Sequence, residues 1–177
     1  MSKSNLFIAI CILVIGCLSG FAYWSNNELT KQADIYWEDS LQELFSMYTD
    51  RGVMRIKKKP KEEQIFIEVE KLYKKENYLK GIAQLEQFLR EDPGNEAVYI
   101  RLATLYALSE QIVTAQNYLH KIQENPLSEY TADALWFEAL LSIKAQQIAE
   151  VKPLLEATIK ANGNHKKKAS EFLNRIN

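Results

Sequence analysis

Residues 91–126 read EDPGNEAVYIRLATLYALSEQIVTAQNYLHKIQENP, and this stretch decides the fold that the sequence predicts. Its apolar side chains recur at the three- and four-residue spacing of one helix face, before and after a polar break at 109–111. Pro93 and Pro126 bound the two runs, because proline cannot continue a helix. The stretch therefore predicts two helices joined by a short turn.

The same pattern recurs on both sides of this stretch. A shift of 34 positions carries small or apolar residues onto residues of similar character at five of six positions. The six positions are Val69, Leu72, Tyr78, Gly81, Ile82 and Leu85, matched by Ala103, Tyr106, Ile112, Ala115, Gln116 and Leu119. A further shift of 36 carries Ala103, Ala115 and Leu119 onto Ala139, Val151 and Leu155. The chain is thus expected to repeat one helical hairpin about three times.

Composition favours an all-α fold. The 177 residues include only 6 Gly and 4 Pro, too few turn residues for an all-β domain. We expect about three helix pairs over residues 62–163. The segment from His165 onward, with an apolar face, predicts a C-terminal capping helix that completes the domain at 62–177.

The repeated positions resemble the tetratricopeptide repeat (TPR) family. In the first unit the resemblance is carried by Tyr78, Gly81, Ile82, Leu85 and Asp92-Pro93-Gly94-Asn95, and in the second by Tyr99, Leu102, Ala103, Tyr106, Ala115 and Leu119. The third unit, from Ala132, is a weaker match. The whole arrangement is similar to small membrane-anchored bacterial proteins of this family. The resemblance implies an α-solenoid that binds other proteins.

The resemblance also implies a binding surface, because the first helix of each pair lines a concave groove in this family. The groove residues that it implies are Phe66, Tyr73, Ile100, Trp136, Leu140 and Ile143. They form a largely apolar and aromatic stripe, which suits a peptide or an amphipathic helix from a protein partner. Two other interpretations remain open. In the first, a helix of this chain or a second copy of the chain covers the stripe. In the second, the residues of the stripe belong to the internal core.

The N-terminal run Leu6–Trp24, LFIAICILVIGCLSGFAYW, contains no charged residue. As a helix it spans about 28 Å, close to the hydrocarbon thickness of a bilayer. It therefore predicts a transmembrane anchor after a short tail at 1–5. The alternative is a lipoprotein signal, in which Cys17 is lipidated. Lys3 before the run favours an orientation with the N-terminus inside and the soluble domain outside. Together with the resemblance, this implies a single-pass protein of the bacterial inner membrane, with its soluble domain in the periplasm.

Residues 25–61 divide into an amphipathic helix and a basic linker. The helix is expected over Ile35–Tyr48, and its apolar face consists of Trp37, Leu41, Leu44, Phe45 and Tyr48. Four lysines of the linker are candidate contacts for anionic lipid or an acidic partner: Lys57, Lys58, Lys59 and Lys61. A solvated linker without a ligand is the alternative.

The sequence offers few candidates for catalytic residues. The only histidines are His120 and His165, and both cysteines lie in the first apolar run. No glycine-rich phosphate loop or nucleophile elbow is present, so we expect no enzyme activity, no catalytic residue and no cofactor. Metal-ligand clusters are lacking too. A net charge of −1 gives no general attraction to nucleic acid, and none is expected as a partner.

These features predict a membrane-anchored TPR scaffold or adaptor that binds proteins through an apolar concave groove. A structural or regulatory subunit of a membrane complex, with its groove permanently occupied, is the second hypothesis. A lipid-anchored lipoprotein with a TPR domain is the third.

Overall fold

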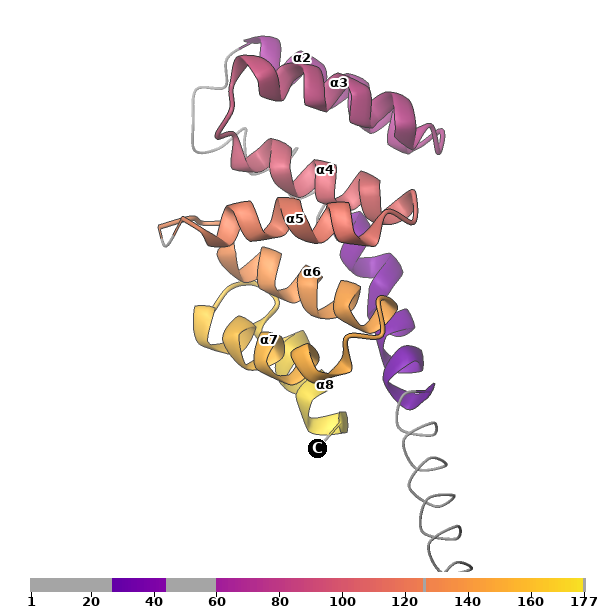
Figure 1. Cartoon of the computed structure of the whole chain (residues 1–177), viewed down its shortest axis with the longest axis vertical. Coiled ribbons are helices and arrows are strands. Elements are labelled where there is room, and N and C mark those ends of the chain that lie inside the picture. Colours follow the sequence, from indigo (N-terminus) through magenta and orange to yellow (C-terminus); the bar gives the residue numbers. More distant parts are fainter. Residues whose placement is uncertain (1–26, 44–59, 126, 177) are drawn as a thin grey trace, which may run out of the picture.

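The computed structural model describes residues 27–43, 60–125 and 127–176, and within these ranges it contains helices and no strand. Its helices are an unlabelled one over residues 27–43, here the 27–43 helix, then α2 (Pro60–Tyr73), α3 (Tyr78–Glu91), α4 (Glu96–Leu108), α5 (Ile112–Gln123), α6 (Thr131–Lys144), α7 (Ile148–Ala161) and α8 (Lys166–Ile176). Figure 1 shows α2 to α8 stacked in chain order, and each helix packs mainly against its sequence neighbours. This arrangement is consistent with the predicted α-solenoid.

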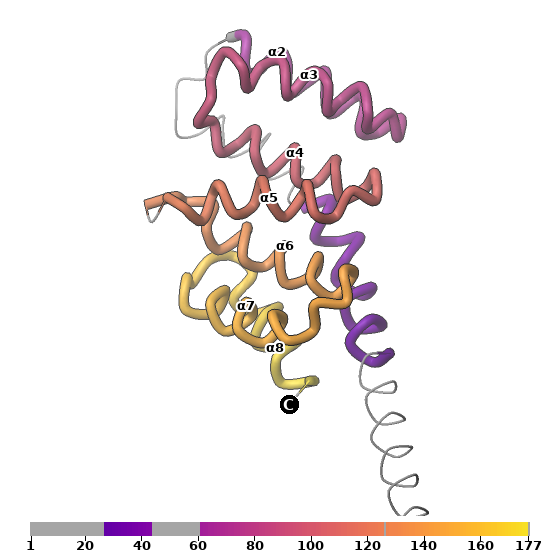
Figure 2. The backbone as a smooth tube through the Cα atoms, viewed as in Figure 1, coloured from indigo at the N-terminus to yellow at the C-terminus, as the bar shows by residue number. Residues whose placement is uncertain are grey.

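The 27–43 helix does not follow the direction of the stack. Figure 2 shows it running across the other helices, close to the long axis of the molecule, whereas α4 to α6 lie across that axis. It therefore meets helices from more than one hairpin, although it is separated from all of them by at least sixteen residues of sequence.

The turn inside each hairpin is built in the same way three times. Glu76, Glu110 and Gln146 have φ angles of 56°, 60° and 60°, the left-handed conformation that commonly ends a helix. In each turn the next N–H bonds back to the carbonyl five residues earlier, as Asn77 N does to Leu72 O at 2.9 Å. The spacings between these residues are 34 and 36, the same repeat spacings found in the sequence.

Small side chains lie where the paired helices approach each other. Ala103, Ala115 and Ala139, three of the repeated positions, are completely buried. Gly81 is also buried, and a Cβ there would lie 2.9 Å from Leu105 Cδ1. The repeat pattern therefore sets the distance between helices as well as their order.

The membrane part of the predicted fold and location requires a correction. Among the helices of the described ranges, none is long and apolar enough to span a bilayer. The predicted anchor at Leu6–Trp24, the tail at 1–5 and the lipidation candidate Cys17 lie outside the described residues. The predicted transmembrane helix, and the single-pass periplasmic location that depends on it, are not borne out by these helices.

Gly163 provides a test of the packing between the loop after α7 and the start of α6. A Cβ at Gly163 would lie 2.4 Å from Ala132 Cβ, closer than two carbon atoms can approach. We expect Gly163→Ala to lower the free energy of unfolding by about 1–3 kcal/mol, measured by urea denaturation, because the backbone must shift.

A second substitution and a control make this test specific. Ala132→Gly removes the clashing atom and should restore most of the loss when combined with Gly163→Ala. Gly94→Ala meets no atom within 4 Å and should stay within about 0.5 kcal/mol of the wild type. Equal losses at both glycines would contradict the packing explanation.

Candidate interaction surface

The first helices of the second and third hairpins, with α8, form one apolar face, here the inner face. It comprises Ile100 and Ala107 of α4, Trp136, Leu140 and Ile143 of α6, and Phe172 of α8. The 27–43 helix covers this face. Leu41 packs in the core cluster that contains Ile100 and Ala107, whereas Leu29, Ala33 and Tyr36 pack in the cluster that contains Trp136 and Phe172. The chain therefore fills its own inner face.

Trp136 lies at the centre of this interface and is completely buried. Its indole Nε1–H donates a hydrogen bond of 2.9 Å to Ser40 Oγ, which is also fully buried. The Tyr36 ring meets the indole edge-on at 5.5 Å between centroids, and the His165 ring stacks on it at 5.6 Å. A buried indole needs a partner for its N–H, and the 27–43 helix supplies one at the point of closest packing.

Polar contacts surround the apolar centre. Lys144 Nζ lies 2.6 Å from Asp34 Oδ1, and Lys168 Nζ lies 2.5 Å from Glu43 Oε2. Arg175 also donates a hydrogen bond of 2.6 Å to Gln32 Oε1. An apolar centre inside a polar rim is the usual organisation of an interface between two proteins.

The predicted groove residues occupy several environments. Ile100, Trp136, Leu140 and Ile143 are buried beneath the 27–43 helix or within the clusters that it completes. Phe66 is buried at the first hairpin, with the Arg101 guanidinium 3.7 Å from its ring centroid. Tyr73 is half-buried, and its ring lies 6.2 Å from that of Tyr78. The stripe exists, but its central part is occupied by the chain itself.

Of the four linker lysines that were predicted as contacts, one is described by the structure. Lys57, Lys58 and Lys59 lie outside the described residues. Lys61 is exposed and pairs with Glu91 of α3. This single described lysine therefore gives no sign of a lipid or acidic-partner site.

The amphipathic helix was predicted in the right region but with an incomplete face. Residues 27–34 are helical as well, so the helix starts earlier than the expected Ile35, which is itself exposed. Sequence reasoning missed four buried residues of this helix: Leu29, Ala33, Tyr36 and Ser40. Leu44, Phe45 and Tyr48 lie outside the described residues. A spacing of three or four that admits small residues at 33 and 40 is the signal that identifies the buried face.

Two histidine–carboxylate contacts occur, and neither has the arrangement of an active site. His165 Nε2 lies 3.2 Å from Asp133 Oδ1 in the interior, beside Trp136. On the other side of α6, the buried Glu138 carboxylate accepts hydrogen bonds from His120 and Gln123. In the portion of the chain that the structure describes, no group of three histidine, cysteine or acidic side chains is placed to hold a metal ion.

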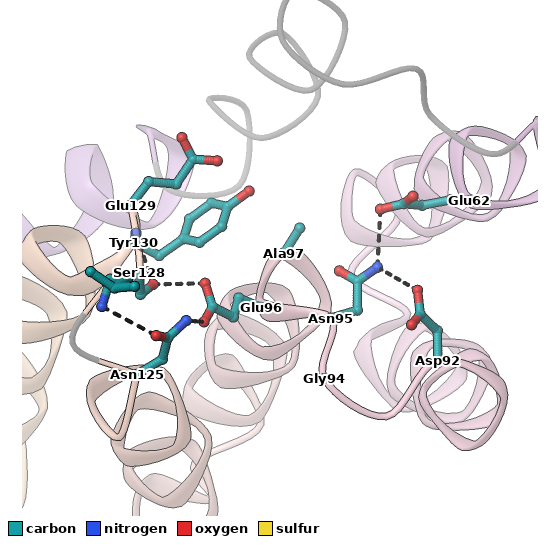
Figure 3. Close-up of a pocket in the computed structure, with 11 residues that line it drawn as sticks. Glu62, Asp92, Gly94, Asn95, Glu96, Ala97, Asn125, Ser128, Glu129 and Tyr130 are labelled. Atoms are coloured by element: carbon teal, nitrogen blue, oxygen red, sulfur yellow. Dashed lines mark hydrogen bonds between the residues drawn. The ribbon is translucent and has the colours of Figure 1, made fainter.

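A pocket of about 610 Å³ lies where the connections between hairpins meet, and it is lined by carboxylates (Figure 3). Three of these acids, Glu62, Asp92 and Glu96, accept hydrogen bonds from neighbouring side chains. Asn95 Nδ2 donates to Glu62 Oε1 at 3.2 Å, and Asn125 Nδ2 donates to Glu96 Oε1 at 2.7 Å. Glu62 and Glu96 occupy equivalent repeat positions, and each binds an asparagine from the connection after the next helix. The pocket is thus a joint between successive hairpins.

Tyr130 is the titratable residue of this pocket that burial changes most. Burial raises the pKa of Tyr130 to about 12, and the neighbouring Glu129 carboxylate acts in the same direction. Ionisation there would place a phenolate in a partly desolvated site beside acidic groups.

Comparisons with protein-family models, with curated proteins and with solved structures find no match to this chain.

The hydrogen bond from Trp136 to Ser40 can be isolated by a double-mutant cycle. Ser40→Ala should lower the free energy of unfolding by about 1–3 kcal/mol, because it leaves a buried indole N–H without an acceptor. In a Trp136→Phe background the same change should cost much less. Ser170→Ala, which removes an exposed hydroxyl contact within α8, is the control and should change stability by less than about 0.5 kcal/mol.

The raised pKa of Tyr130 predicts a loss of stability in alkali. In the unfolded chain a tyrosine titrates near pH 10. Below about pH 10 both the folded and the unfolded chain keep the proton, so the contribution of Tyr130 to stability is fully present. That effect should fall as pH rises from about 10 to about 12, because only the unfolded chain releases the proton in this window. Urea midpoints measured across this range should decline less steeply for Tyr130→Phe. Identical slopes for the variant and the wild type would contradict the assignment.

Proposed function

We propose that this protein is a non-enzymatic scaffold of the TPR-like class, which binds partner proteins by holding an amphipathic helix on its inner face. The observation that carries the proposal is the 27–43 helix itself. It lies on the inner face through an apolar centre, a buried hydrogen bond and a polar rim. A surface that fits one helix so completely is suited to a helix as ligand.

The size and chemistry of the contact support this proposal. Trp136, Tyr36 and Phe172 meet at one point of the inner face, with ring centroids 5.5 to 6.4 Å apart. Aromatic residues at the centre of an interface typically supply most of its binding energy. The linear order of the hairpins supplies an extended surface for such contacts.

A second candidate function follows from the same burial. Because Trp136 is fully covered, the inner face also suits a structural subunit whose own helix never leaves it. The two functions differ in one measurable property, the rate at which the 27–43 helix opens. In a scaffold, its amides should exchange with solvent by local opening, faster than those of α4 and α6.

A released full-length variant tests the scaffold proposal directly. Ala33 is completely buried against the inner face, so Ala33→Asp places an unpaired charge in the interface and should displace the 27–43 helix. Every residue of the inner face is unchanged. We expect this variant to bind a synthetic peptide with the sequence of residues 27–43, measured by fluorescence anisotropy. It should bind at least about 100-fold more tightly than the wild type, whose own helix competes at millimolar effective concentration.

The matched control introduces the same residue on the exposed side of the same helix. Gln42 is exposed, and Gln42→Asp should leave peptide binding as weak as in the wild type. A folded Ala33→Asp chain that fails to bind the peptide would contradict the scaffold proposal. Amides of the 27–43 helix that exchange only on global unfolding would favour the structural subunit instead.

A further inference from the structure

The charges at the inner face are divided between the helix and its support. The 27–43 helix carries five acidic side chains and one basic one: Glu28, Asp34, Glu38, Asp39 and Glu43, against Lys31. Over α8 the balance is reversed, with four basic side chains and one acidic: Lys166, Lys167, Lys168 and Arg175, against Glu171. Of the basic side chains of α8, Lys168 and Arg175 contact the 27–43 helix. Lys166 and Lys167 instead contact Asn162 and Glu171.

Two acidic side chains of the 27–43 helix form ion pairs with lysines of the helices beneath it. Lys144 of α6 binds Asp34 at 2.6 Å, and Lys168 of α8 binds Glu43 at 2.5 Å. The side chains of Lys144, Lys168 and Glu43 have exposed fractions of 32%, 30% and 33%, whereas that of Asp34 is 55% exposed. Both pairs keep some contact with solvent, so salt screens them in part. Across an interface, such pairs distinguish a matching charge from an opposing one.

We infer that the inner face selects an acidic amphipathic helix from a partner protein, and that the 27–43 helix is the stand-in that such a helix displaces. This inference rests on the proposed scaffold function and adds the chemistry of the ligand. The contacts of the 27–43 helix describe that ligand position by position.

Each of the five buried positions of the 27–43 helix has a physical requirement, beginning with an apolar side chain at Leu29. Ala33 is completely buried, so the ligand needs a small residue there. Three residues later, Tyr36 fills the space between Trp136 and Phe172 with an aromatic ring. Ser40 supplies the hydroxyl that accepts the indole N–H. The ligand therefore needs a small residue, an aromatic residue, a hydroxyl-bearing residue and a leucine at the positions of Ala33, Tyr36, Ser40 and Leu41. It also needs carboxylates at the positions of Asp34 and Glu43.

Displacement requires the partner helix to compete with a tethered one. The internal helix acts at an effective concentration in the millimolar range, so a free helix with the same contacts occupies the face only weakly. A partner that adds contacts, or that is itself held nearby, overcomes this barrier. The internal helix therefore protects the apolar inner face until a matching ligand arrives.

A charge-exchange experiment on the full-length chain tests the inference. The chain carries Ala33→Asp to release its own helix, with or without Lys144→Glu and Lys168→Glu at the rim. The probes are the 27–43 peptide and a peptide of the same sequence with Asp34→Lys and Glu43→Lys. We expect the rim changes to weaken the first peptide about tenfold or more and to strengthen the second. Lys80→Glu with Lys160→Glu, at exposed positions of α3 and α7, is the control with the same change in total charge and should change neither affinity appreciably.

The outcomes separate the ligand chemistry from the scaffold function. If both peptides bind both chains equally, the charge selection is overturned while the scaffold function stands. If the released chain is folded and binds neither peptide, the scaffold function fails and this inference fails with it. If sedimentation shows that the released chain forms a dimer that excludes the peptide, the ligand is a second copy of this chain and the partner assignment is overturned.

The wild-type chain provides a test that does not depend on the folding of a variant. Hydrogen exchange of the 27–43 amides should accelerate as salt is raised from about 0.05 to 0.5 M, because the rim pairs are screened. The amides of α4 should show no matching change. Exchange of the 27–43 helix that is independent of salt would overturn the role of the rim charges.

Discussion

An inner face made of Trp136, Leu140, Ile143 and Phe172 is unfavourable in water, and this constraint shapes the rest of the molecule. Each such side chain is worth about 1.5–3 kcal/mol when it moves from solvent to a packed interior. A stack of helical hairpins buries its contacts between neighbours but leaves one row of first helices facing outward. Here the 27–43 helix covers that row, and its Ser40 hydroxyl accepts a hydrogen bond from the indole N–H of Trp136. The occupied inner face is therefore part of the fold.

The sequence predicts the helical repeat well because repetition multiplies weak signals. A single match such as Gly81 with Ala115 means little, whereas the 34- and 36-residue shifts reappear in the positions of Glu76, Glu110 and Gln146. Those three residues carry no turn signal of their own, since glycine usually occupies the left-handed position. Their conformation is recovered only because the helices on either side require the chain to reverse there. The family resemblance also placed Trp136 among the groove residues, and in the structure it packs against the 27–43 helix.

The occupant of the inner face was harder to predict, for a physical reason. The most buried positions of the 27–43 helix include Ala33 and Ser40, which are small because the partner surface is close. Small and polar residues add little to an apolar pattern, so the pattern alone started the helix at Ile35, whereas residues 27–34 are helical as well. Distances of about a hundred residues in sequence, such as that between Ser40 and Trp136, leave no periodic trace. The membrane anchor was predicted from hydropathy alone, and none of the described helices has the length and apolarity to span a bilayer.

The left-handed turns within the hairpins have a consequence for how this chain tolerates changes in length. Each turn is closed by a bond from the residue after the reversal to the carbonyl five residues before it, which leaves no freedom in its span. One inserted residue there would rotate the second helix by about 100° and turn its apolar side away from the core. The connections between hairpins show no such bond among their described residues, and the longest of them, residues 124–130, accompanies the one repeat spacing of 36. Insertions and deletions should therefore accumulate on that edge of the stack, while the opposite edge keeps a fixed length.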